Sequence, residues 1–258
     1  SKGDNLIAPR AATELIPVSP RRATEVLVVL TIMVIAMGGM IRIYDAGESC
    51  PDWPTCFGTF GFDISEEEQG EWWEENPDEA DSRGSGHRYT TFEIFTEWFH
   101  RLLAGAFVGP LVILNWFLIR TDFQNSPRVR GVSSLTLALI LWQGAIGWLT
   151  VKLDNENWSV AIHLGSALAF MISLIWLWIE IRRDEEDLPN WISFDPLVGM
   201  KWRKWIGILS FSTLITLFSG VYVSTTPGAN YGCGVSGMLE SWPLCNGQLI
   251  QDVDDWEL

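Results

Sequence analysis

Three ionisable residues lie together in EIFTEWFHR, residues 93–101, which leads directly into the apolar stretch LLAGAFVGPLVILNWFLI. Glu97, His100 and Arg101 fall on one helix face, because positions three and four apart lie above one another on a helix. Ionisable side chains inside a membrane are costly and mark functional sites by default. A second histidine, His163, begins another apolar stretch, AIHLGSALAF. Proton transfer and metal ligation are the chemistry that these residue types can do.

The two histidines are expected at the same depth, about 6–9 Å below the outer surface at 1.5 Å per residue. Bundle cores build haem sites from facing helices, and paired imidazoles are common axial ligands of haem iron. We therefore predict that His100 and His163 ligate one haem iron. Two alternatives stay open: a hydrogen-bonded histidine at a helix interface, and a zinc site that would need Glu97 as a further ligand. His87, in the polar RGSGHRY, is expected to be exposed.

The charged neighbours of His100 have two interpretations. As functional groups, Glu97 would handle protons, and Arg101 and Arg42 would bind haem propionates by paired hydrogen bonds. As structural groups, Glu97 and Arg101 would form an ion pair at the membrane interface. We take Glu97 as the candidate catalytic residue.

Five apolar blocks must position these residues. Each is about 19 residues or longer, which is the length that crosses a hydrocarbon core of about 30 Å. A soluble bundle would need polar helix faces that these blocks lack. The predicted fold is an all-α polytopic membrane protein, and its spans lie at 23–41, about 98–119, 132–151, 160–179 and 205–223.

The distribution of Lys and Arg predicts the orientation. Basic residues concentrate in 1–23, 120–130 and 182–204, so these segments and the N-terminus are expected in the cytoplasm. The first block reads as a retained anchor, because it is too long for a cleaved signal peptide. The expected location is a prokaryotic cell membrane, with the loop 44–92 outside. The net charge of −15 does not suggest nucleic acid as a partner.

All four cysteines fall on the predicted outer side, where disulfides can form. Four cysteines allow three pairings, and proximity favours Cys50 with Cys56 and Cys233 with Cys245. A metal site is the alternative, but no histidine accompanies either pair.

The cysteine loops also indicate an internal repeat, since WPTCFG at 53–58 matches WPLCNG at 242–247. Repeats imply copies of one structural unit. The second copy contains only its first helix and outer loop, so the chain is expected to be truncated at its C-terminal end. The predicted organisation is a tail (1–23), a four-helix unit (24–182), a cytoplasmic linker (183–202) and the start of a second unit (203–258).

Four motifs in order resemble the heme A synthase family: GGMIRIYDAGESCPDWPTCFG, EWFHRLLAG, WQGAIGWLTV and AIHLGSALAF. The resemblance covers 24–182 and 203–247 and implies eight membrane helices in two pseudo-repeated halves. Such enzymes oxidise a methyl group of haem O to a formyl, making haem A for terminal oxidases. It implies that the first half, with Glu97, His100 and His163, holds the substrate haem. The second half normally supplies another histidine pair for a haem b cofactor.

No histidine follows His163, so the haem b ligands are expected beyond Leu258 and this chain alone is expected to be inactive. The expected reaction is stepwise hydroxylation and dehydration, with oxygen source and electron partner open and haem O synthase as a candidate partner. The alternative is a diheme b-type electron-transfer subunit linked to quinol. That class would need ligand pairs on both membrane sides, whereas both histidines lie on the outer side.

Overall fold

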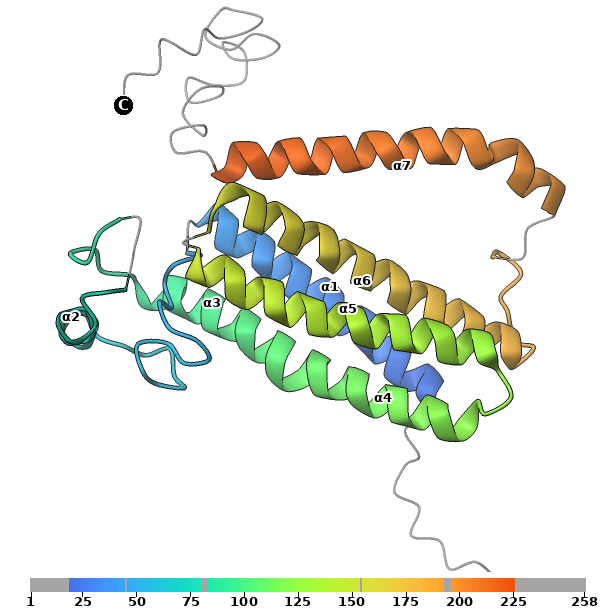
Figure 1. Ribbon diagram of the computed structural model, residues 1–258, viewed down its shortest axis with the longest axis horizontal. Helices are drawn as coiled ribbons and strands as arrows, with labels where there is room; N and C mark the ends of the chain where they lie inside the picture. Colours follow the sequence, from blue (N-terminus) through green and yellow to red (C-terminus); the bar gives the residue numbers. More distant parts are fainter. Residues whose placement is uncertain (1–18, 45, 80–82, 154, 193–195, 226–258) are drawn as a thin grey trace, which may run out of the picture.

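The computed structural model describes residues 19–44, 46–79, 83–153, 155–192 and 196–225. Its long helices are α1 (Pro20–Ile43), α3 (Thr91–Leu102), α4 (Gly109–Asp122), α5 (Pro127–Lys152), α6 (Asn157–Asp184) and α7 (Pro196–Thr225). A π-helical turn, η1 (Leu103–Val108), joins α3 to α4 in one rod. A short helix, α2 (Glu66–Glu75), lies in the loop between α1 and α3 (Figure 1).

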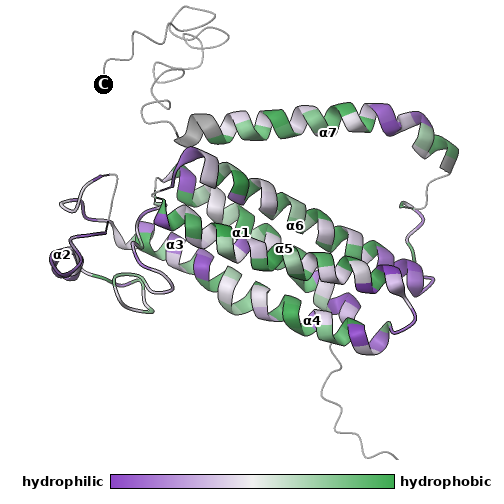
Figure 2. Cartoon of the chain, viewed as in Figure 1, coloured by the Kyte–Doolittle hydropathy of each residue, from purple (hydrophilic) through white to green (hydrophobic). Residues whose placement is uncertain are grey.

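Five helices in the described part of the chain are long and apolar enough to cross a membrane, which confirms the predicted fold class. Each extends beyond its apolar block, and in α1 and α3 a capping residue outside the block sets the start. Ser19 caps α1 with Pro20 at the first turn, and Thr90 and Glu93 form a capping box at the start of α3. Helix α3 therefore begins before Glu97, and Figure 2 shows the polar residues gathered at the helix ends.

Helices α1, α3–α4, α5 and α6 form a four-helix bundle in which α1 packs on α6, α6 on α5, α5 on α4 and α4 on α1. One buried cluster in this bundle combines Leu27 of α1, Val112 of α4 and Phe170 of α6. Helix α7 packs beside α6, and its other faces are apolar and exposed (Figures 1 and 2).

The π-helical turn has a local cause in Pro110. Proline has no N–H, and its ring clashes with the carbonyl four residues earlier in a regular α-helix. The chain widens before the proline, and Gly109 N–H donates to the carbonyl of Ala104, five residues back. Wide turns of this kind are frequent at functional sites, and this one begins three residues after His100.

The acidic loop between α1 and α3 has its own small core. Cys50, Cys56, Phe57, Trp73 and Ile94 belong to one buried cluster. Gln69 of α2 is also buried, and its amide exchanges hydrogen bonds with the main chain of Tyr89. The charged face of α2 is solvent-exposed, as the composition suggested, but its other face fastens the loop to the start of α3.

Candidate functional site

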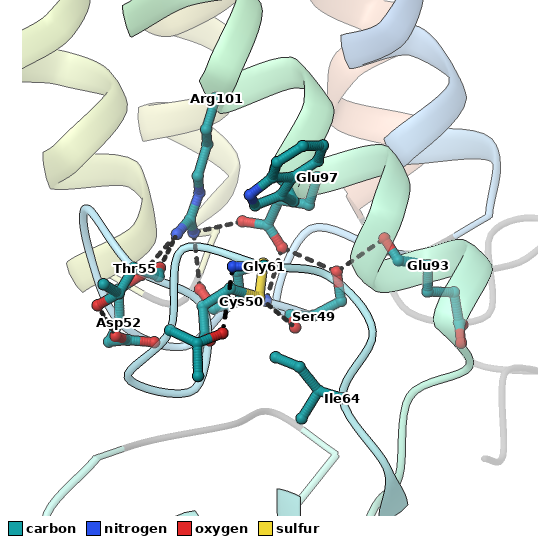
Figure 3. The surroundings of a disulfide bond; sticks show 12 residues. Ser49, Cys50, Asp52, Thr55, Gly61, Ile64, Glu93, Glu97 and Arg101 are labelled. Carbon is teal, nitrogen blue, oxygen red and sulfur yellow. Dashed lines mark hydrogen bonds and ion pairs between the residues drawn. A yellow bond between two sulfur atoms is a disulfide. The ribbon is translucent and has the colours of Figure 1, made fainter. Parts of the chain in front are cut away.

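The loop between α1 and α3 is closed by a disulfide between Cys50 and Cys56, both of which are buried (Figure 3). The second predicted pair, Cys233 and Cys245, lies outside the described residues. The loop follows α1 and lies against the first turns of α3, where Glu97 and Arg101 face it.

Glu97 is only 4% exposed, and its carboxylate is fully engaged by the disulfide loop. One oxygen, Oε2, accepts hydrogen bonds from the Cys50 N–H at 2.8 Å and the Ser49 hydroxyl at 3.0 Å. The other, Oε1, accepts from Arg101 Nη2 (Figure 3). Ser49 was not singled out in the sequence, because a serine 48 positions away gives no local signal.

Arg101 donates to the same loop. Its guanidinium reaches the carbonyl oxygens of Cys50 at 2.7 Å and Thr55 at 3.1 Å, and also that of Asp52. The i, i+4 ion pair of the structural interpretation is thus present, and it is extended by main-chain contacts. Arg42 lies in the last turn of α1, beside Gly47. Both terminal nitrogens of Arg101 contact the loop.

His100 points away from this network, toward α1. Its Nδ1 lies 3.0 Å from the carbonyl oxygen of Val34. Its ring also packs against Gly38 of the same helix, where an added Cβ would lie 3.4 Å from the ring carbon Cε1. Helix α1 therefore fixes the ring of His100.

His163 is held by α5 and by its own helix. The Gln143 amide nitrogen lies 3.2 Å from His163 Nδ1 and 3.1 Å from the main-chain oxygen of His163. Ser166 donates its hydroxyl proton to Gln143 Oε1 at 2.5 Å. Gly147, one turn after Gln143, meets the ring so closely that an added Cβ would lie 2.9 Å from Cε1.

The two histidines enter the bundle from the same end, since α3 and α6 both begin there (Figure 1). The Asn155 side chain, just before α6, donates to the carbonyl oxygen of Gly47, and this contact joins the start of α6 to the loop that follows α1. Among the described residues, no group of three or more His, Cys, Asp and Glu side chains could hold a metal ion. Two imidazoles from opposite helices of one bundle fit the axial ligands of a haem iron.

A cavity of about 420 Å³ lies elsewhere, at the opposite end of the bundle. The residues lining it are Arg128, Gly131, Val132, Leu135, Trp176 and Glu180. On α5 this lining ends eight positions before Gln143, or about 12 Å at 1.5 Å per residue. It does not belong to the histidine site.

Comparisons with known proteins identify relatives of this chain. Heme A synthase from Novosphingobium aromaticivorans is 26% identical over 96% of this chain and 71% of its own length. Heme A synthase from Shewanella oneidensis is 30% identical over 61% of this chain and 44% of its own length. Heme A synthase from Shouchella clausii is 26% identical over 86% of this chain and 62% of its own length. The chain thus spans 44% to 71% of the length of these relatives.

No solved structure gives a significant match. The curated matches do not favour the alternative of a quinol-linked electron-transfer subunit. The model of the COX15-CtaA family, described as cytochrome oxidase assembly protein, matches residues 21–257. By that match, which covers nearly all of its length, this chain belongs to the COX15-CtaA family.

Proposed function

We propose that this chain carries the haem O site of a heme A synthase, which oxidises a methyl group of haem O to a formyl. His100 and His163 are the proposed axial ligands of the substrate iron. The observation that carries the proposal is their placement: each enters the same end of one bundle on a different helix, and a polar group of a neighbouring helix holds each ring. Family membership and the names of the curated relatives support the same activity.

The reaction needs two hydroxylations of one carbon and the loss of one water. Haem iron can supply the oxidising chemistry when haem is bound, while the protein sets ligation, proton supply and access. Glu97 is the proposed proton-handling group, three positions before His100 on α3. The hydroxyl of the buried Ser49 donates to Glu97 Oε2 at 3.0 Å. Arg42, in the last turn of α1, and Arg101 are the proposed propionate partners.

The membrane placement follows from the same proposal. The N-terminus is cytoplasmic, and the disulfide loop and the histidines lie at the outer side of a prokaryotic cell membrane. Haem O would come from haem O synthase. A second haem, haem b, is proposed as a cofactor of the whole protein, outside the described residues.

The test is expression from the complete gene in a bacterial host that makes haem O but no haem A. Extracted haems are separated by chromatography and identified by mass. We expect haem A with the unmodified protein and none with His100→Ala or His163→Ala. Purified variants should also lose the bis-imidazole component of the spectrum that comes from haem O, while the component of haem b remains. Haem A production by either variant, or an unchanged spectrum, would remove that histidine from the site.

A further inference from the structure

The two imidazoles have hydrogen-bond partners of opposite kind. The Val34 carbonyl oxygen lies 3.0 Å from His100 Nδ1, and a carbonyl oxygen can only accept. His100 Nδ1 therefore carries the ring proton and donates it, and Nε2 keeps the lone pair that a metal needs. This contact fixes both the tautomer and the orientation of the ring.

His163 faces a donor instead. The Gln143 nitrogen lies 3.1 Å from the main-chain oxygen of His163, which can only accept, so the amide must turn its NH₂ group to this side. The Ser166 hydroxyl, 2.5 Å from the amide oxygen, holds that orientation. An amide NH₂ group can only donate, and it lies 3.2 Å from Nδ1 and 3.4 Å from Nε2 of the ring, so the ring meets a donor here and not an acceptor.

This difference affects how strongly each ring can bind iron. A ligating histidine that donates its other N–H to an acceptor is fixed in place and is a better electron donor to the metal. His100 has such an acceptor, whereas the polar side chain beside the His163 ring, Gln143, is a donor. We propose that His100 is the strong, fixed ligand of the haem O iron and that His163 is the weaker, exchangeable one; this inference rests on the proposed function. Gln143, held by Ser166, is the positioning residue of the exchangeable ligand.

An exchangeable ligand suits a haem that is a substrate. A resident haem keeps both axial bonds, whereas haem O must enter and haem A must leave. With one weak iron–histidine bond, the His163 ring can leave the iron on the α5–α6 side without disturbing His100, which is held by α1.

Carbon monoxide gives a direct test, because it replaces one axial ligand of a ferrous haem and its C–O stretch reports the ligand that stays. The protein is expressed from its complete gene and purified with haem O, and the double variant His100→Ala/His163→Ala supplies the background of any other haem. We expect the C–O stretch of the unmodified protein to match that of His163→Ala, in which only His100 remains. A match to His100→Ala, or a mixture of the two, would overturn the inference.

The positioning role is tested by Gln143→Leu. Loss of a partner of a metal-ligating histidine typically changes metal affinity 10- to 100-fold. We expect CO to bind about tenfold less tightly, because the His163 ring competes better for iron once the amide donor beside it is removed. The C–O stretch should stay unchanged, since His163 is off the iron in the CO complex. A general distortion of the site would move both readings and would contradict a specific role for Gln143.

Two glycines in the same helix provide a matched pair. Gly147→Ala places a methyl group 2.9 Å from the His163 ring, whereas an added Cβ at Gly144 meets nothing within 4 Å. Gly147→Ala should raise CO affinity and Gly144→Ala should not, and equal effects would contradict the inference. If neither histidine variant alters haem binding, the proposed function fails. If both alter it but CO displaces His100, only the ranking of the ligands fails.

Discussion

Glu97→Gln is the most informative single change, because it separates an anchoring carboxylate from a proton-handling one. The Glu97 and Arg101 side chains are 6% and 14% exposed, so the pair is largely screened from water. In the variant, the new NH₂ group must face either the Arg101 guanidinium or the donors of Ser49 and Cys50. Each choice sets a donor against a donor and leaves Arg101 without a counter-charge.

Removing one partner of a buried ion pair costs about 3–5 kcal/mol. At about 1.4 kcal/mol per tenfold, the opening of the disulfide loop should become roughly 10²- to 10⁴-fold more frequent. Hydrogen exchange at the Cys50 amide, which donates to Glu97 at 2.8 Å, measures that opening directly. Glu93→Gln is the matched control, because Glu93 lies on the same helix and glutamine can replace glutamate in a capping box.

The double variant Glu97→Gln/Arg101→Gln then separates stability from chemistry. It removes the uncompensated charge, so loop exchange should recover part of the way toward the unmodified protein. If Glu97 handles a proton of the reaction, haem A production stays lost in the double variant. Recovery of haem A together with the loop would make Glu97 an anchor only. Loop exchange in Glu97→Gln within about 0.5 kcal/mol of the unmodified protein would refute the anchoring argument itself.

Three further predictions concern the rest of the chain. Gly38→Ala brings a methyl group to 3.4 Å from the His100 ring, while the methyl group of Gly39→Ala meets nothing within 4 Å. Only Gly38→Ala should shift the haem spectrum. Identical spectra of the two variants would contradict the packing of His100 on α1. Single cysteines placed on the exposed face of α2 should react with a membrane-impermeant maleimide on intact cells, and protection would reverse the proposed orientation. Hydrogen bonds from the Ser65 N–H and hydroxyl hold the pKa of Glu68 below its ordinary 4.5. The start of α2 should therefore be fully stabilised above pH 4.5 and should lose this contribution as pH falls through the lower pKa of Glu68 in the folded loop. Amide exchange in α2 should follow this pH profile in the unmodified protein but not in Glu68→Gln.

The fold was largely predictable because the membrane imposes a simple rule on length and hydropathy. Five long apolar blocks became five helices, and only their ends moved outward to capping residues such as Ser19 and Thr90. The wide turn was not predicted, although Pro110 was a visible cause. Helix α2 was missed as well, since its two buried residues, Gln69 and Trp73, stand within an acidic stretch that resembles a solvated loop.

The site was predictable in its residue types more than in its contacts. The spacing of Glu97 and Arg101 indicated a shared helix face, and the structure pairs them. Their loop partners could not be found from the sequence, because main-chain N–H and carbonyl groups carry no residue signature. Gln143 and Gly147 stood in one of the quoted motifs, but nothing local connects them with a histidine on the next helix.

The wide turn η1 also has a consequence for how this rod tolerates change. A π-helical turn is equivalent to one extra residue within an α-helix, and one residue corresponds to about 100° of rotation at 3.6 residues per turn. Deleting one residue between Leu103 and Val108 would restore a regular helix without shortening the apolar span much. Because the wide turn accommodates the extra residue locally, the segment with Glu97 and His100 would keep its phase relative to the segment that packs on α1 and α5. A one-residue deletion elsewhere in α3 or α4 would instead rotate one segment by about 100° relative to the other, so η1 is the place where this rod best tolerates such a change.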